Sequence, residues 1–226
     1  MPVHYSLVIE PAATSGAPLM LLLHGSGGTE RDMVPLAARL SPGSVAVAIR
    51  GALPWENGFA FFRRFEDRSI DEDNLVTQAG VLANDIPPIR TGCRSSRAPI
   101  AVGFSNGAIM AAALLIRYPG LLSGAVLFRP LSPFARRDRA NIPGTPVLII
   151  DGSDDERRSP GDGARLARGL TRHGATVTHH VLRAGHSLEE QDLCLAREWL
   201  EAQGSWVDRN TDPQRPMLGE DSSVLL

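Results

Sequence analysis

Apolar residues along the chain form either short continuous runs or helix-like spacings. A continuous run suits a strand that is buried on both faces, as in a parallel sheet. Such runs predict strands at 19–23, 45–49, 99–104, 124–128 and 147–150, and shorter apolar patterns predict two more at 5–10 and 176–182. Apolar residues three or four positions apart predict helices that include 33–40, 75–86, 109–116, 166–170 and 193–200. The alternation predicts an α/β fold with a mostly parallel central sheet, helices on both faces and ligands at the carboxyl ends of the strands.

Two stretches depart from this alternation and set the expected boundaries. Pro87-Pro88 predicts the end of the second helix, because proline lacks the backbone N–H and its ring clashes with the preceding turn. A chain of 226 residues fits one domain, which we place at 1–206. The polar, proline-containing stretch 207–226 predicts a loosely packed C-terminal tail.

Composition narrows the classes of partner. The formal net charge is −2 and basic residues form no long block, which argues against nucleic acid or an anionic membrane as partner. Cys93 and Cys194 are too few for a disulfide framework or a metal site and are interpreted as free thiols. No apolar run reaches the roughly 18 residues that span a bilayer. We therefore expect a cytoplasmic protein that acts on a small molecule, without a metal or another cofactor.

The strand at 99–104 runs into Gly103-Phe104-Ser105-Asn106-Gly107, and a helical pattern follows directly. A Gly-x-Ser-x-Gly sequence between strand and helix is typical of a nucleophile elbow, a tight turn that exposes a serine hydroxyl. The two glycines leave room for the chain to fold back on itself. Unpaired N–H groups at the start of the helix favour developing negative charge. This context predicts Ser105 as a catalytic nucleophile.

Two further side-chain types complete the chemistry that a serine needs. An acidic loop with Asp151, Asp154 and Asp155 follows the strand at 147–150, and His186 lies in the turn after the strand at 176–182. Imidazole takes the serine proton, and a carboxylate orients the imidazole. The order serine, acid, histidine is that of the α/β-hydrolase fold. The residues alone leave the choice of the acid open.

Four segments together resemble one known family: Leu21–Gly28, Gly103–Ala108, Gly152–Asp155 and Gly185–Ser187. The resemblance, which covers about residues 18–203, is to small serine carboxylesterases related to acyl-protein thioesterases and lysophospholipases. Segments 50–64 and 71–75 look closer to bacterial hydrolases linked to hydroquinone and quinone resistance. The family's Gly-x-x-Asp spacing, counted from Gly152, selects Asp155 as the acid, with Asp154 as the alternative.

The resemblance also implies an oxyanion hole made by the backbone N–H groups of Ser26 and Asn106. Many relatives carry glutamine in place of Asn106, which changes little if the backbone N–H is the functional group. Proline often follows the acid in relatives, whereas Glu156 stands here. His24 is interpreted as a structural hydrogen-bonding residue of the same loop.

Five aromatic residues gather between positions 51 and 68, and we expect this segment to wall the substrate pocket. The predicted pocket residues are Trp55, Phe59, Phe61 and Phe62, with Phe65 nearby. The alternatives are that these residues pack in the core or bury the surface of a homodimer. His179-His180 does not predict a metal site, since neighbours on a strand point to opposite faces.

These observations together predict a serine hydrolase that cleaves small carboxylic esters through an acyl-enzyme on Ser105. One alternative is a thioesterase or lysophospholipase, which would use the same residues but needs an apolar channel for a long acyl chain. A second alternative is a catalytically silent hydrolase-fold binding protein. Silent members usually lose one of the three catalytic side chains, whereas this chain has all three candidates.

Overall fold

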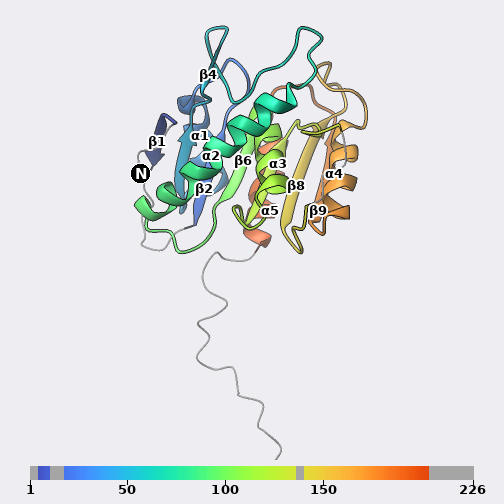
Figure 1. Cartoon of the computed structure of the whole chain (residues 1–226). Helices are drawn as coiled ribbons and strands as arrows, with labels where there is room; N and C mark the ends of the chain where they lie inside the picture. The colour runs from blue at the N-terminus through green and yellow to red at the C-terminus, as the bar shows by residue number, and fades with distance from the viewer. Residues whose placement is uncertain (1–4, 11–17, 136–139, 204–226) are drawn as a thin grey trace, which may run out of the picture.

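The computed structural model describes residues 5–10, 18–135 and 140–203 (Figure 1). Its strands are β1 (Leu7–Glu10), β2 (Leu19–Leu23), β3 (Val45–Ile49), β4 (Leu53–Trp55), β5 (Gly58–Ala60), β6 (Ile100–Phe104), β7 (Gly124–Phe128), β8 (Pro146–Gly152) and β9 (Thr176–Leu182). Its α-helices are α1 (Glu30–Leu40), α2 (Glu72–Gly92), α3 (Asn106–Arg117), α4 (Asp162–Arg172) and α5 (Glu190–Ala202). The predicted strands and helices are therefore present, and the segment after β3 adds the small hairpin β4–β5.

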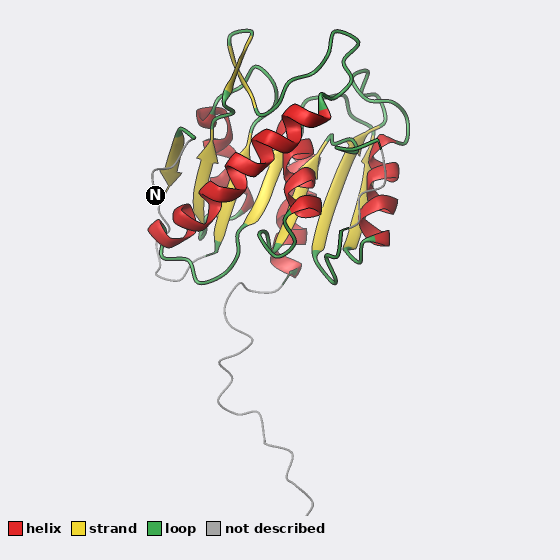
Figure 2. Cartoon of the chain, viewed as in Figure 1, coloured by secondary structure: helices red, strands yellow, loops and turns green. Residues whose placement is uncertain are grey.

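Seven strands form one twisted sheet in the order β1-β3-β2-β6-β7-β8-β9 (Figure 2). β1 pairs antiparallel with β3, and every other pairing in this sheet is parallel. The mostly parallel sheet expected from the apolar runs is thus confirmed. Because β6, β8 and β9 run in the same direction, the segments that follow them lie at one edge of the sheet.

Helices cover both faces of the sheet and create two apolar cores. On one face, α2, α3 and α4 pack against side chains such as Leu21 and Leu23 of β2. On the other face, α1 and α5 pack against the alternate residues Met20 and Leu22. Every residue of α3 except Arg117 is buried, as expected for the central helix under the sheet. The nucleophile segment therefore sits between rigid, fully packed elements.

The prediction that Pro87-Pro88 ends the second helix is wrong. α2 continues to Gly92 through both prolines. Two prolines in an isolated helix cost about 3 kcal/mol each. Tertiary packing offsets this cost, because Ile86 and Ile89, on either side of the prolines, are both buried in the core. The hydroxyl of Thr91 also donates a hydrogen bond to the Pro87 carbonyl, and the exposed Pro87 lies on the solvent side.

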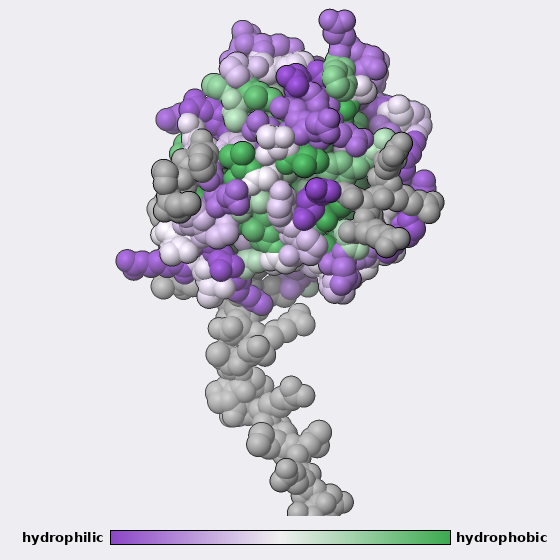
Figure 3. Space-filling model, in the orientation of Figure 1, coloured by the Kyte–Doolittle hydropathy of each residue, from purple (hydrophilic) through white to green (hydrophobic). Residues whose placement is uncertain are grey.

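The predicted tail, 207–226, lies outside the described residues, so its packing stays a prediction. Within the described ranges, no helix is both long and apolar enough to cross a membrane. On the face shown in Figure 3, apolar residues form small groups among hydrophilic ones. The two cysteines carry free thiols, as predicted.

Candidate active site

Ser105 occupies a sharp turn between β6 and α3. Its φ is 52° and its ψ is −106°, a conformation that residues other than glycine rarely adopt. A Cβ at Gly107 would lie 2.1 Å from the Leu23 carbonyl oxygen, and one at Gly103 would lie 2.6 Å from Ala108 backbone atoms. Both glycines of the motif are therefore needed for close approach of the backbone, as the Gly-x-Ser-x-Gly pattern predicts.

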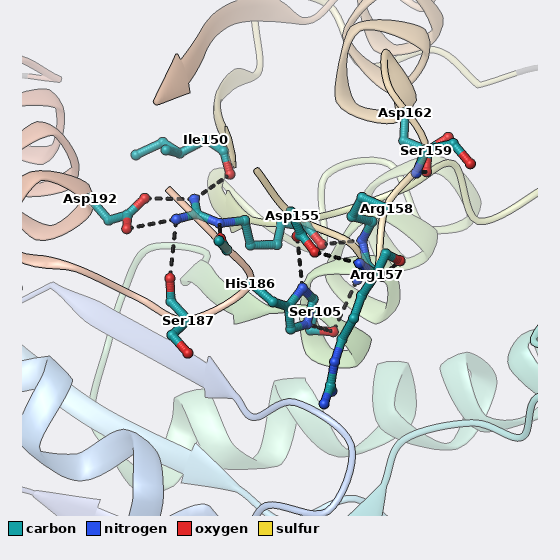
Figure 4. Close-up of polar contacts among 12 residues, drawn as sticks. Ser105, Ile150, Asp155, Arg157, Arg158, Ser159, Asp162, His186, Ser187 and Asp192 are labelled. Carbon is teal, nitrogen blue, oxygen red and sulfur yellow. Dashed lines mark hydrogen bonds and ion pairs between the residues drawn. The ribbon is translucent and has the colours of Figure 1, made fainter. Parts of the chain in front are cut away.

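Side chains from three separate loops converge at this turn (Figure 4). The Oγ of Ser105 lies 2.9 Å from Nε2 of His186, and Nδ1 of His186 lies 2.7 Å from Oδ2 of Asp155. The side chain of Asp155 is fully buried. The neighbouring Asp154 is exposed, and its carboxylate accepts a hydrogen bond from Ser153 instead. The structure thus brings Ser105, His186 and Asp155 together and leaves Asp154 outside the group.

The surroundings of His186 favour its neutral form. Burial is the main cause that lowers the pKa of this imidazole, and the positive charges of Arg158 and Arg157 lower it further. The Asp155 carboxylate acts in the opposite direction. Because the net shift is downward, His186 holds an unprotonated nitrogen at neutral pH.

A buried arginine holds the loop that carries His186. Arg129, directly after β7, is fully buried and forms a two-pronged ion pair with Asp192 of α5, with N–O distances of 2.7 and 2.9 Å. Its Nε and Nη2 also donate to the carbonyls of Gly185 and Ser187, the residues on either side of His186. The backbone at His186 is therefore tied to the sheet and to α5 at the same time.

The loop after β2 lies on the other side of Ser105. His24 Nε2 accepts a hydrogen bond from Gly51 N–H, so its Nδ1–H donates to the Gly25 carbonyl. Burial lowers the pKa of His24 and keeps this tautomer neutral. The backbone of Phe59 exchanges two hydrogen bonds with Gly27 and Gly28. These contacts fix the segment that presents the Ser26 N–H and agree with the structural role predicted for His24.

The aromatic segment does not wall the cleft in the way that the sequence analysis predicted. Phe61 and Phe62, directly after the hairpin, are fully buried and belong to the core cluster that also contains residues of β2 and α3. Phe59 stacks under the guanidinium of Arg50, 4.6 Å from the ring centre. Of the four predicted residues, only Trp55 lines the cleft, together with Phe65. The first alternative, packing in the core, is correct for Phe61 and Phe62.

Asn106 has a use for its side chain that sequence reasoning missed. This side chain is buried, its Oδ1 accepts from the Phe61 N–H at 2.8 Å, and its Nδ2 donates to the Phe62 carbonyl at 3.5 Å. The amide therefore joins the start of α3 to the aromatic segment. Neither the Ser26 N–H nor the Asn106 N–H donates a backbone hydrogen bond within the described residues.

Arg158 is the second residue that sequence reasoning missed. Its Nη2 donates to the Oγ of Ser105 at 3.0 Å, and its Nε donates to the Arg129 carbonyl at 2.7 Å. The available signal was the sequence after the acid, where Glu156 stands in place of the proline that often follows it in relatives and two arginines come next. Because these residues lie next to a catalytic candidate, this departure from the family pattern can change substrate specificity.

The converging side chains open into a cleft of about 530 Å³, lined by Ser26, Trp55, Phe65, Phe104 and six charged residues among others. A larger groove of about 1030 Å³ lies beside α4 and contains none of the three converging side chains. The chemistry therefore belongs to the smaller cleft. Among the described residues, no cluster of metal-ligand side chains is present, and His179 pairs with Asp151 at 2.7 Å.

Comparison with known proteins identifies the family. No family model matches the sequence. The chain is 34% identical over 183 residues to MhqD of Bacillus subtilis, which is named as a hydrolase, and the match covers 80% of this chain and 91% of the relative. The structure superposes on the Bacillus cereus carboxylesterase with a TM-score of 0.84 and 32% identity, over 88% of this chain and 94% of the other. The chain belongs to the α/β-hydrolase carboxylesterases.

Other relatives agree with this assignment. The carboxylesterase from Mesorhizobium loti superposes on this carboxylesterase with a TM-score of 0.83 at 29% identity, over 87% of this chain and 94% of the other. Esterase YpfH of Escherichia coli is 25% identical over 206 residues, which cover 87% of this chain and 88% of the relative. SOBER1 of Arabidopsis thaliana, at 17% identity and a TM-score of 0.71, shares the fold. The esterase and carboxylesterase relatives agree that the chain is a carboxylic ester hydrolase.

Proposed function

We propose that this carboxylesterase hydrolyses small carboxylic esters through an acyl-enzyme on Ser105, with His186 as the general base and Asp155 as the residue that orients it. The observation that carries the proposal is the continuous contact from Ser105 Oγ through His186 to Asp155, at 2.9 and 2.7 Å. The arrangement meets the requirements of a nucleophile, a base within hydrogen-bond reach and a buried carboxylate behind the base.

In the first half-reaction, His186 Nε2 takes the hydroxyl proton while Ser105 Oγ attacks the ester carbonyl carbon. The carbonyl oxygen becomes an oxyanion, and the backbone N–H groups of Ser26 and Asn106 stabilise it. Both groups are suited to this role because neither donates a backbone hydrogen bond within the described residues. The bond between the former carbonyl carbon and the alkoxy oxygen then breaks, which leaves the acyl group on Ser105. The His186 imidazolium gives its proton to the leaving alkoxide.

In the second half-reaction, His186 takes a proton from water, and the resulting hydroxide attacks the acyl carbon. Collapse of this intermediate releases the carboxylic acid, and Ser105 recovers its proton. Asp155 stabilises the imidazolium in both halves without itself taking a proton. The lowered pKa of His186 supports this cycle, because the base is already neutral at the start.

The lining of the cleft supports a small ester over a long acyl chain. Arg64, Arg68, Arg157 and Arg158 share the cleft with Glu56 and Glu66. A thioesterase or lysophospholipase would have to bury a long hydrocarbon chain against these charges, at the cost of their hydration. We therefore expect the specificity constant to fall as the acyl chain lengthens.

A series of p-nitrophenyl esters from acetate to dodecanoate tests this function. We expect the highest kcat/KM with short chains, a rise of kcat/KM with pH whose midpoint lies below about 6.5, and covalent labelling of Ser105 by a fluorophosphonate. Ser105→Ala should lower kcat by about 10⁴ or more. A folded Ser105→Ala variant with full activity, or a folded wild type that resists the fluorophosphonate, would overturn the proposal.

A further inference from the structure

The cleft around Ser105 carries more positive than negative charge, although the chain as a whole has a formal net charge of −2. Four arginines and two glutamates line it: Arg64, Arg68, Arg157, Arg158, Glu56 and Glu66. Both glutamates are exposed, and no ion pair joins either of them to an arginine within the described residues. The positive charge is therefore concentrated where the substrate must bind.

Arg158 is half-buried, and every described group that accepts a hydrogen bond from it is neutral. They are the carbonyls of Arg129 and Arg157, at 2.7 and 3.0 Å, and the hydroxyl of Ser105, at 3.0 Å. Burial lowers the pKa of Arg158 to about 10, and the charge of Arg64 adds to this effect. A cation that has lost hydration without gaining a carboxylate partner is a strong site for an anion.

The carboxylates near Arg158 are already engaged elsewhere. Asp155 binds His186 at 2.7 Å, Asp151 binds His179 at 2.7 Å, and Asp162 binds Arg165 at 2.7 Å. They reduce the electrostatic cost of Arg158 only from a distance. Within the described residues, Arg158 forms no ion pair.

Arg64 brings a second guanidinium to the same cleft from a different part of the chain. It is half-buried, donates to the Arg68 carbonyl at 2.9 Å, and forms no ion pair within the described residues. Burial lowers its pKa, and Arg68 lowers it further. Two partly desolvated guanidinium groups, one after β5 and one after β8, thus flank the cleft that contains Ser105.

We propose that the preferred substrates are esters whose acyl group carries a carboxylate, that is, half-esters of short dicarboxylic acids, and that Arg158 with Arg64 binds this carboxylate. This inference rests on the proposed function of Ser105. A carboxylate matches the planar donor fork of arginine and supplies the charged acceptor that both guanidinium groups lack. Hydrolysis of such a half-ester consumes one water and yields the dicarboxylate, the alcohol and a proton.

The position of Arg158 sets the expected side and length of the substrate. Its Nη2 contacts the Oγ of Ser105, the atom to which the acyl group becomes bonded. The carboxylate must therefore lie a few bonds from the scissile carbonyl and on the acyl side, where it stays bound through both half-reactions. Binding of this carboxylate also draws the guanidinium away from the nucleophile, because an ionised acceptor is stronger than a hydroxyl.

Matched ethyl esters test the inference. We expect kcat/KM for monoethyl succinate to exceed that for ethyl butyrate by roughly tenfold to a hundredfold, the range expected for a charge-assisted hydrogen bond. Acid release is followed at constant pH. The butyryl ester of glycolate, which carries its carboxylate on the alcohol side, serves as the positional control. A preference for this ester over monoethyl succinate would overturn the acyl-side assignment.

Variants assign the preference to the two arginines. Arg158→Gln should reduce the succinate-to-butyrate ratio by about tenfold or more, and Arg64→Gln should reduce it by a smaller factor. Arg158→Lys should restore only part of the ratio, because an ammonium lacks the planar fork. Arg168→Gln, which removes the same charge from an exposed position of α4, should leave the ratio unchanged.

Failure of the inference is distinguishable from failure of the proposed function. Hydrolysis of ethyl butyrate without a preference for monoethyl succinate removes the inference and leaves the role of Ser105 intact. A ratio that neither Arg158→Gln nor Arg64→Gln changes also removes it. Should Arg158→Gln fail to fold, inhibition of the wild type by free succinate, compared with butyrate, decides the question: equal inhibition would contradict the proposed site.

Discussion

Two adjacent carboxylates differ completely in their surroundings. Asp155 is buried against His186, while Asp154 is exposed and its carboxylate accepts a hydrogen bond from Ser153. Because Asn cannot hold the imidazole in the required tautomer, we expect Asp155→Asn to lower kcat by about 10⁴. Asp154→Asn is the matched control and should stay near wild-type activity. Steady-state kinetics of the two variants check this. A comparable loss of kcat in Asp154→Asn, with Asp155→Asn active, would show that Asp154 is the catalytic acid.

Removal of the Asn106 side chain should affect the free energy of unfolding more than it affects kcat. Its removal leaves the Phe61 N–H buried without a partner, so Asn106→Ala should lower the free energy of unfolding by about 1–3 kcal/mol. If the backbone N–H is the oxyanion donor, kcat should fall by far less than the roughly 10²–10³ that loss of a donor costs.

Urea unfolding and kinetics on the same sample check the Asn106 prediction. Ser26→Ala, at an exposed position, is the control and should change neither quantity much. A hundredfold loss of kcat in a folded Asn106→Ala variant would instead make the side chain a donor.

At the scale of single residues, the sequence predicted those that a motif carries. Ser105, Asp155 and His186 each follow a strand of the parallel sheet, and the structure brings them together. Arg158 escaped prediction because its contact with Ser105 spans two loops that are distant in sequence. Aromatic character alone also could not separate Phe61, which faces the core, from Trp55, which lines the cleft.

At the scale of elements, the turn before α5 depends on the Arg129–Asp192 pair. Arg129→Met leaves the buried Asp192 carboxylate without its partner, so the free energy of unfolding should fall by about 3–5 kcal/mol. Replacing both residues, with Arg129→Met and Asp192→Leu, should recover much of this loss. Chemical unfolding of the single and double variants provides the measurement.

The control for this pair is Arg165→Met. Arg165 is mostly exposed and pairs with Asp162 at the surface, where such a pair contributes less than about 1 kcal/mol. Arg129→Met should also reduce kcat more than it raises KM, because the carbonyls on both sides of His186 lose their donor. An Arg129→Met variant as stable and active as Arg165→Met would contradict the assigned role.

Elements were predicted well where one local pattern decided them. The strands β2, β3, β6, β7 and β8 coincide with continuous apolar runs, and α3 begins directly after the motif serine. The end of α2 was mispredicted because the proline rule considers only the local backbone. It does not include the free energy gained when Ile89, beyond the prolines, is buried in the core. The hairpin β4–β5 was missed because its strands are only three residues long and pair partly with the 27–28 backbone.

At the scale of the whole molecule, two histidines link stability to pH. Burial is the largest cause that lowers the pKa of both His24 and His186 below the ordinary 6.5. As the pH falls through about 6.5, the unfolded chain therefore binds protons first, and the folded state loses stability until the folded-state pKa values are passed. Above that window these two groups add no pH dependence.

His24→Gln tests this linkage. Glutamine does not titrate, so the drop in the free energy of unfolding between pH 7.5 and pH 5 should be smaller in the variant than in the wild type. Urea titrations at the two pH values measure it. An equal drop in the wild type and in His24→Gln would contradict this linkage.

The Arg129–Asp192 pair also has a consequence for synthesis, because its two residues lie on either side of His186 in the sequence. A nascent chain that has just exposed His186 already contains Ser105 and Asp155, but the carboxylate of Asp192 is still to come. Until α5 docks, Arg129 would be a buried cation without its counter-ion, and the turn around His186 would lack its anchor. We therefore expect the hydrolase to become competent only after α5 has left the ribosome and docked on the sheet, so that ester cleavage waits until the fold is closed.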